Sequence, residues 1–123
     1  MKSILLVEDD PFLVDIYTTK LKQTGFKVKV VTDGEDVFKV LKEESFDVVI
    51  LDIVLPNVDG WEVLKRIKQD SGLKDTKVII LSNLGQKTEV EKGLKLGAIK
   101  YLIKAYYTPS EVVEEIKKVL NKK

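Results

Sequence analysis

Five short apolar runs rich in Val and Ile recur along this chain, and longer amphipathic stretches separate them. Three of the runs are almost continuously hydrophobic, which is typical of strands buried on both faces of a sheet. Strands that alternate with helices favour a parallel sheet covered on both faces, so the sequence predicts a doubly wound α/β fold. The five predicted strands are Ile4–Val7, Val28–Thr32, Val48–Leu51, Val78–Leu81 and Ile99–Ile103.

The predicted helices lie between and after these strands. The first one follows Asp10-Pro11, where Asp is a preferred N-cap and Pro suits the first helical position. Its apolar residues at helical spacing are Phe12, Leu13, Ile16, Tyr17 and Leu21. With no internal repeat and no Pro/Gly/Ser-rich linker, residues 1–123 are expected to form a single domain. The five predicted helices cover Pro11 to about Thr24, Glu35–Glu44, Gly60–Asp70, Lys87–Leu96 and a last segment that follows Thr108-Pro109-Ser110.

The absence of cysteine and histidine excludes several chemistries. A structural zinc site, a disulfide framework and a thiol nucleophile all need one of these residues. A Ser-His-Asp triad is impossible for the same reason. Any metal must be bound by oxygen ligands, which favours magnesium, calcium or manganese.

Charge and hydropathy set further limits on the partners of the chain. Its 21 basic and 20 acidic side chains leave a net charge of +1, so direct binding to nucleic acid or to a membrane surface is not expected. Three carboxylates stop the apolar opening Ile4–Val7, which is therefore neither a signal peptide nor a membrane span. We expect a cytoplasmic protein.

Polar side chains follow four of the five predicted strands, at the point where each strand ends. In an open parallel sheet these ends lie along one edge, which is where ligands bind. The second strand instead runs into Thr32-Asp33-Gly34, which indicates a turn. The other four strands place carboxylates, a hydroxyl and an ammonium at the same edge: Glu8-Asp9-Asp10, Asp52, Ser82-Asn83 and Lys104.

These groups together suit phosphoryl chemistry. Carboxylates that converge in one pocket repel one another unless a cation is present, and without His or Cys an oxygen-ligated Mg²⁺ is the natural partner. A cation beside a lysine and a hydroxyl suits a phosphoryl group, whose oxygens need charge neutralisation and hydrogen bonds. A carboxylate can itself be the nucleophile and form an aspartyl phosphate. Asp52 is the candidate nucleophile because its strand is expected to be central.

Four motifs, in this order and spacing, resemble the receiver domain of two-component response regulators, the CheY-like family. Each motif is weak alone, but together they extend from the first strand to the last. The resemblance implies a flavodoxin-like fold with five parallel strands in the order 2-1-3-4-5. The motifs are Glu8-Asp9-Asp10 after the first strand, Val48–Pro56 followed by Asp59-Gly60, Leu81-Ser82, and Gly97–Lys104.

The resemblance implies a phosphoacceptor and a metal site. Asp52 would accept a phosphoryl group from the phosphohistidine of a sensor histidine kinase or a phosphotransfer protein. Asp9 and Asp52 would bind Mg²⁺ directly, and Glu8 would assist through water. The backbone carbonyl of Val54 would complete the protein's share of the coordination shell. Such a domain is a phosphoacceptor that assists its own phosphorylation and dephosphorylation, rather than an enzyme.

The resemblance also implies a switch. Ser82 would hydrogen-bond the phosphoryl group, and Lys104 would pair with another of its oxygens. Movement of the Ser82 hydroxyl would let Tyr101, three positions before the lysine, turn inward. The surface that changes is the face formed by the fourth helix, fifth strand and fifth helix, which would bind an output protein or a covalent effector domain, or a second copy of the chain. Phosphorylation would stabilise one of two states.

Two departures from the family pattern, and a pair of apolar residues near the site, lead to separate expectations. Ala105 stands where proline commonly follows the lysine, and a cis bond at a non-proline residue costs about 3 kcal/mol. The Lys104–Ala105 bond is therefore either trans in a reshaped loop or cis and held by the site. Asn83 replaces a small residue and is expected to narrow access to the phosphoryl group. Apolar Val54 and Leu84 occupy positions that in the family admit or orient the attacking water, so we expect slow dephosphorylation.

Other classes of function fit the sequence less well. A haloacid-dehalogenase-type phosphatase needs a second Asp two residues after the nucleophile, and Asp52-Ile53-Val54 lacks it. A flavodoxin-like or dinucleotide-binding protein would need a phosphate-binding loop after the first strand, where Glu8-Asp9-Asp10 would repel phosphate. A receiver-like interaction module that works without phosphorylation stays open as the alternative. The chain fits both a stand-alone regulator and a receiver taken from a longer protein.

Overall fold

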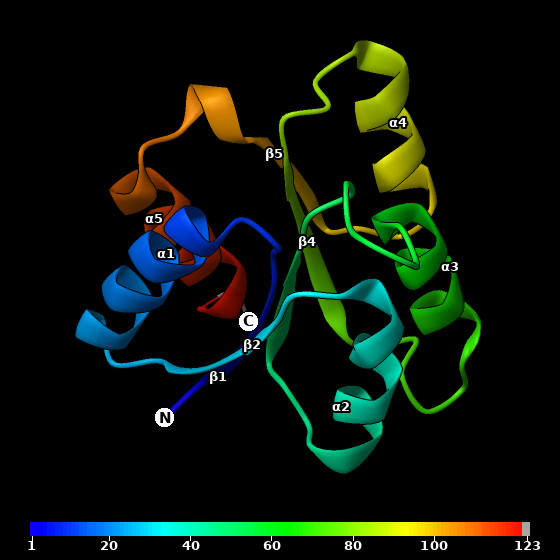
Figure 1. Cartoon of the computed structure of the whole chain (residues 1–123), viewed down its shortest axis with the longest axis horizontal. Helices are drawn as coiled ribbons and strands as arrows, with labels where there is room; N and C mark the ends of the chain where they lie inside the picture. Colours follow the sequence, from blue (N-terminus) through cyan, green and yellow to red (C-terminus); the bar gives the residue numbers. More distant parts are fainter. Residues whose placement is uncertain (122–123) are drawn as a thin grey trace.

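A computed structural model, which describes residues 1–121, contains one five-stranded parallel sheet with helices on both faces (Figure 1). The strand order is β2-β1-β3-β4-β5, which confirms the predicted fold class and order. Residues 122 and 123, which the predicted domain includes, lie outside the described residues. The strands are β1 Ser3–Val7, β2 Lys27–Val31, β3 Val48–Leu51, β4 Lys77–Ser82 and β5 Lys100–Ile103.

Five α-helices and two short 3₁₀ turns connect and cover the strands. The predicted second helix begins as the 3₁₀ turn η1, and a second such turn, η2, follows β5 directly. No helix among residues 1–121 has both the length and the apolar character needed to cross a membrane. The helices are α1 Pro11–Gln23, α2 Val37–Glu43, α3 Gly60–Gln69, α4 Lys87–Lys95 and α5 Pro109–Leu120, and the 3₁₀ turns are η1 Gly34–Asp36 and η2 Lys104–Tyr106.

The two helices that matter most for the site have well-formed N-termini. At α1 the Asp10 carboxylate accepts hydrogen bonds from the backbone N–H groups of Phe12 at 2.9 Å and Leu13 at 3.4 Å, which confirms the predicted N-cap. At α5 Thr108 and Glu111 form a reciprocal capping box, with distances of 3.2 and 2.9 Å. Both helices therefore begin at defined residues on the edge of the sheet where the strands end.

The sheet separates two hydrophobic cores, and Figure 1 shows α1 and α5 on one face and α2, α3 and α4 on the other. Alternate residues of each strand enter opposite cores, as the pleat requires. The α1–α5 core consists of Ile4, Leu6, Tyr17, Leu21, Val48, Ile50, Ile79, Leu81, Leu102, Val112, Val113, Ile116, Val119 and Leu120. The α2–α4 core consists of Leu5, Val7, Val31, Val37, Leu41, Val49, Leu51, Ile53, Val63, Leu64, Ile67, Val78, Ile80 and Ala98.

One residue of the predicted apolar series in α1 does not belong to the buried face. Phe12 is 73% exposed, whereas Tyr17 and Leu21 are buried and Leu13 packs against the same core. The inward face of α1 contains residues 13, 17 and 21, which are four positions apart. Residue 12 is rotated by about 100° around the helix axis from residue 13. Phe12 therefore projects away from the sheet at the first turn of α1.

Candidate functional site

The register of the central strands brings Glu8 and Asp52 side by side. Val7 at the end of β1 pairs with Leu51 at the end of β3, and each of the two acids follows its strand directly. The backbone N–H of Asp52 donates to the carbonyl of Val7 at 3.0 Å, so the ladder extends one residue past the strands. The side chains of Glu8 and Asp52 therefore start from neighbouring positions on the carboxyl edge of the sheet.

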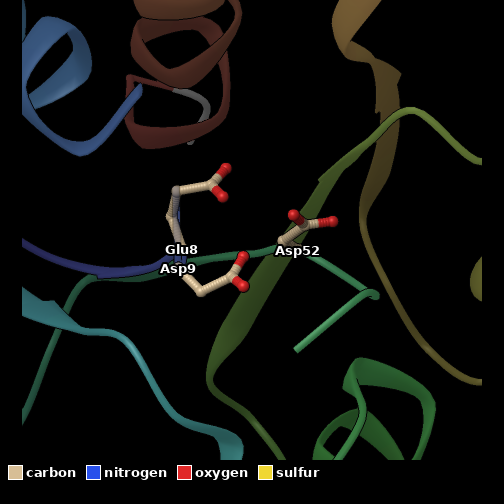
Figure 2. A group of neighbouring side chains, drawn as sticks. All are labelled: Glu8, Asp9 and Asp52. Atoms are coloured by element: carbon tan, nitrogen blue, oxygen red, sulfur yellow. The ribbon is translucent and has the colours of Figure 1, made fainter. Parts of the chain in front are cut away.

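Three carboxylates meet at this edge. One oxygen from each of Glu8, Asp9 and Asp52 lies within 4.8 Å of the others. Figure 2 shows the Asp9 carboxylate turned toward Asp52, and the Glu8 carboxylate turned toward the side of α1 and α5. Glu8 is 1% exposed and Asp52 is 6% exposed, whereas Asp9 is open to solvent. The cluster thus has a buried inner wall and an accessible mouth.

Lys104 lies between the two buried acids. Its Nζ is 2.6 Å from Glu8 Oε1 and 2.8 Å from Asp52 Oδ2, and its side chain is only 10% exposed. Burial alone would lower the pKa of Lys104, but its hydrogen bonds to Asp52 and Glu8 outweigh burial and raise the pKa. Burial raises the pKa of the Glu8 carboxyl, against the opposing effect of the Lys104 hydrogen bond. The lysine therefore stays charged in the site.

The three carboxylates and Lys104 together carry an excess of negative charge that a divalent cation can neutralise. When ionised, the three carboxylates carry three negative charges, and the ammonium of Lys104 compensates one of them. Two negative charges then remain around an all-oxygen donor set, which is the chemistry that Mg²⁺ prefers. The residues present therefore fit a magnesium ion.

The segment after β3 folds back over Asp52. Oδ1 of Asp52 accepts the backbone N–H of Ile53 at 2.7 Å and that of Val54 at 3.4 Å, which fixes the orientation of the carboxylate. The N–H of Gly60 donates to the carbonyl of Ile53 at 2.7 Å. A Cβ at Gly60 would lie 2.4 Å from the Asp52 carbonyl oxygen, so this close approach requires glycine. Val54 is 60% exposed at the mouth of the site.

Ser82 and Tyr101 lie beside this cluster, on the next two strands of the sheet. Ser82 is fully buried, and its Oγ accepts the backbone N–H of Leu84 at 3.3 Å. The Tyr101 hydroxyl donates to the carbonyl of the same leucine, and its half-buried ring packs against the α2–α4 core. Both side chains therefore hold the loop between β4 and α4.

The loop after Lys104 takes the first of the two predicted forms. The Lys104–Ala105 bond is trans, as are all peptide bonds in the described part of the chain. The backbone turns through η2, which begins at Lys104 itself. Ala105 and Tyr106 are exposed on this turn, and Asn83 is also exposed after β4.

The sequence reasoning did not assign a site role to two residues that the structure brings to the site or its switch. Tyr17 of α1 belongs to the predicted apolar series, and burial raises the pKa of its phenol, with smaller effects from the charges of Lys104, Glu8 and Asp52. Gly93 of α4 lies against the ring of Tyr101, where a Cβ would be 2.8 Å from Cδ2. Helical spacing predicted the burial of Tyr17, and a phenol in that series was the one signal of a polar role. For Gly93 the signal was a glycine inside a helix.

Comparison with known proteins agrees with this geometry. Residues 4–117 match the response regulator receiver domain. The transcriptional regulatory protein GltR of Pseudomonas aeruginosa is 35% identical over 121 residues, which are 98% of this chain and 50% of GltR. The alkaline phosphatase synthesis transcriptional regulatory protein PhoP of Bacillus subtilis is 31% identical over 98% of this chain and 49% of its own. The chain thus spans about half the length of the curated relatives it matches.

Solved structures show the same fold. The BeF₃-activated N-terminal receiver domain of RstA from Klebsiella pneumoniae superposes with a TM-score of 0.89 and 26% identity, over 98% of this chain and 100% of that one. The chemotaxis protein CheY4 of Vibrio cholerae gives a TM-score of 0.89 and 25% identity, over 98% and 99% of the two chains. Family match, fold and acidic edge agree, and the chain belongs to the response regulator receiver (CheY-like) family of two-component systems.

Proposed function

We propose that this receiver accepts a phosphoryl group on Asp52, in a Mg²⁺-dependent reaction, from the phosphohistidine of a sensor histidine kinase or a phosphotransfer protein. The observation that carries the proposal is the Asp52 carboxylate itself. It is buried, held by two backbone N–H groups, and lies 2.8 Å from a lysine ammonium beside two further acids. A surface aspartate that only caps a turn would need neither the lysine nor the acids.

The chemical step is a displacement at phosphorus. A carboxylate oxygen of Asp52 forms a bond to the phosphorus atom, and the phosphorus–nitrogen bond to the donor imidazole breaks. The imidazole nitrogen keeps that electron pair and takes a proton from solvent, so the donor leaves as neutral histidine. Lys104 neutralises charge on an oxygen of the transferred group, and the Ser82 hydroxyl donates a hydrogen bond to another.

A bound Mg²⁺ would neutralise phosphoryl oxygens and lower the repulsion between them and the acids. Asp9 and Asp52 would hold it directly, together with the backbone carbonyl of Val54, and Glu8 would assist through water. The two negative charges that Lys104 leaves uncompensated in the acidic cluster support this assignment.

The output is proposed to be a two-state switch. When Ser82 turns toward the phosphoryl group, the loop between β4 and α4 loses one of its contacts, and Tyr101 with its bond to the Leu84 carbonyl sets the position of that loop. The face formed by α4, β5 and α5 would then bind a downstream protein, an effector domain or a second copy of the chain. A single receiver domain over residues 1–123 and a cytoplasmic location remain part of the proposal.

The test is the intact mass of the protein after incubation with acetyl phosphate, with and without Mg²⁺. We expect one phosphoryl adduct that needs Mg²⁺ and is absent from the Asp52→Asn variant. Asp59→Asn is the matched control, because Asp59 caps α3 at the end of the same loop and asparagine caps a helix equally well. That variant should form the adduct like the wild type.

An adduct in Asp52→Asn, or none in the wild type under any donor, would contradict the proposal. In the second case the receiver-like interaction module that works without phosphorylation becomes the better account. Reverting Ala105 to proline and Asn83 to alanine would then show whether these two departures from the family pattern block the chemistry.

A further inference from the structure

The loop between β3 and α3 passes through a turn that is rare for a residue other than glycine. Among residues 1–121, Asn57 is the one non-glycine residue with a positive φ, at 64°. The backbone N–H of Val58 donates to the carbonyl of Pro56 at 2.8 Å, so Asn57 is the centre of a three-residue turn. Such a turn is strained, and it persists only where neighbouring groups hold it.

The turn that follows β2 lies directly against this loop. The side-chain amide of Asn57 donates a hydrogen bond to Oδ2 of Asp33, which is half-buried. The backbone N–H of Gly34 donates to the carbonyl of Pro56 at 3.4 Å. A Cβ at Gly34 would lie 1.8 Å from the carbonyl oxygen of Val58, so this close approach of the two backbones requires glycine. The turn after β2 thus supports the tip of the β3–α3 loop through both backbone and side chain.

Asp33 uses both oxygens of its carboxylate. Oδ1 accepts the backbone N–H of Glu35 at 2.9 Å and caps η1, while Oδ2 accepts the Asn57 amide. A residue that only capped η1 would need one oxygen, and the hydroxyl of a serine supplies one about equally well. The second oxygen of Asp33 therefore serves the contact with the β3–α3 loop.

The loop supported in this way carries groups of the acidic site. It begins at Asp52, whose Oδ1 accepts the N–H groups of Ile53 and Val54 at 2.7 and 3.4 Å. The N–H of Gly60 closes the base of the loop on the carbonyl of Ile53 at 2.7 Å. The backbone of Val54, whose carbonyl is a proposed Mg²⁺ ligand, lies between this base and the tip at Asn57. Its position therefore depends on the contacts that hold both ends of the loop.

We propose that Asp33 and Asn57 are positioning residues for the metal site. Their hydrogen bond fixes the tip of the β3–α3 loop, and with it the direction of the Val54 carbonyl relative to Asp9 and Asp52. Both residues act through the backbone of the loop. The inference rests on the Mg²⁺ site of the proposed function but does not require phosphoryl transfer. A contact that only stabilised the fold would leave the affinity for Mg²⁺ unchanged.

The test is a titration of ¹⁵N-labelled protein with MgCl₂, followed by the NMR shifts of the backbone amides of Ile53 and Val54. Asn57→Gly removes the side-chain donor and keeps a residue that adopts positive φ without strain. Asp33→Ser keeps an oxygen that caps η1 and removes the acceptor for Asn57. We expect each variant to bind Mg²⁺ about fourfold more weakly than the wild type, the size of effect that the loss of one hydrogen bond produces. The double variant should be no weaker than either, because both changes remove the same contact.

Asp36→Ser is the matched control for the loss of charge. Asp36 is exposed, ends the same 3₁₀ turn, and its side chain forms no capping hydrogen bond with α2. This variant loses the same negative charge as Asp33→Ser. Because salt screens a charge at the surface, Asp36→Ser should weaken Mg²⁺ binding by less than about twofold. Urea unfolding of every variant gives the accompanying change in stability.

Wild-type affinity for Mg²⁺ in Asn57→Gly and Asp33→Ser would overturn the inference, whatever their urea midpoints are. A loss in Asp36→Ser as large as in Asp33→Ser would overturn it too, because charge rather than the hydrogen bond would then be the cause. Losses that multiply in the double variant would show that the two residues act independently, which also contradicts the inference. If the wild type binds Mg²⁺ but forms no phosphoryl adduct, the proposed phosphoryl transfer fails while these affinities still decide the inference. A wild type without Mg²⁺-dependent shifts would overturn both.

Discussion

Helices α5 and α4 flank the same edge strand, β5, but they are packed very differently. Five side chains of α5 are buried: Val112, Val113, Ile116, Val119 and Leu120. Within α4, all of which the structure describes, Gly93 alone is buried, and Leu94 is 46% exposed. Between α4 and α3, the ammonium of Lys92 lies 4.4 Å from the ring centroid of Trp61.

We infer from this difference that the phosphoryl chemistry and the conformational change involve different parts of the molecule. The carboxylate of buried Glu8 is turned toward the side of α1 and α5 (Figure 2), and Lys104 pairs with both Glu8 and Asp52. Ser82 and Tyr101 hold the loop that leads into α4. Helix α4 itself buries only Gly93. Elements with few buried apolar contacts shift at the lowest cost in free energy. We therefore expect phosphorylation to leave α5 in place and to move α4.

The largest expected effect tests the packing of the two helices directly. Ile116→Ala in α5 removes a side chain that is 1% exposed and should lower the free energy of unfolding by about 3 kcal/mol. Leu94→Ala in α4 should cost less than about 1 kcal/mol, because Leu94 is already half in solvent. Urea unfolding of both variants measures this. If Leu94→Ala lost as much unfolding free energy as Ile116→Ala, the proposed difference in packing between α4 and α5 would be wrong.

A second prediction contrasts buried Asp52 with exposed Val54, two residues later. Val54→Asn should shorten the lifetime of the phosphoryl group by about fivefold, about 1 kcal/mol of the barrier, because an amide can orient the attacking water. The decay of the adduct in intact-mass measurements gives the lifetime, and Val54→Ala is the apolar control. A wild-type lifetime shorter than that of Val54→Asn would contradict the expected slow dephosphorylation.

A third prediction concerns the one buried position of α4. A methyl group at Gly93 would lie 2.6 Å from Ile80 Cδ1 and 2.8 Å from Tyr101 Cδ2. Overpacking lowers the unfolding free energy by about 1–3 kcal/mol, and replacing a helical glycine by alanine raises it by about 1 kcal/mol. Gly93→Ala should therefore lose about 1 kcal/mol of unfolding free energy and displace the Tyr101 ring. Lys95→Ala on the exposed side of α4 should lose almost nothing. A gain in stability for Gly93→Ala would show that the contact with Tyr101 is loose.

The smallest expected effect is a pH dependence on the side of α5. Hydrogen bonds from Lys100 and then Lys118 lower the pKa of Glu115, whose side chain is 17% exposed. A lowered pKa in the folded state means that the stabilisation is present above the ordinary pKa of 4.5 and is lost as the pH falls through the folded value. Wild type should exceed Glu115→Gln in unfolding free energy by up to about 1 kcal/mol at neutral pH, and the difference should be smaller at about pH 3, below the ordinary pKa. Urea unfolding at the two pH values measures it, and a difference that persists in acid would exclude the ion pairs as its source.

The sequence was sufficient for the strands and for the edge at which the polar residues meet. Periodicity and the residues after each strand predict both, because a parallel sheet brings all its carboxyl ends to one side. What periodicity could not separate was the role of side chains within a buried series. Phe12 and Tyr17 belong to the same predicted series, yet Phe12 is exposed and Tyr17 is buried in the α1–α5 core.

Contacts between distant segments were also outside the reach of the sequence. The double ion pair of Lys104 and the packing of Gly93 on Tyr101 depend on how strands and helices are placed in space. The isomer of the Lys104–Ala105 bond had two acceptable solutions, and the turn that follows β5 accommodates the trans form. These details come from tertiary packing rather than from local propensity.

Amide hydrogen exchange across α4 and α5 tests most directly whether phosphorylation moves α4 and leaves α5 in place. The protein would be compared with and without Mg²⁺ and acetyl phosphate, with Asp52→Asn alongside. The account predicts that phosphorylation changes exchange in α4 and in the loop between β4 and α4, and leaves α5 unchanged. A change of equal size in α5, or the same change in α4 of Asp52→Asn, would contradict it.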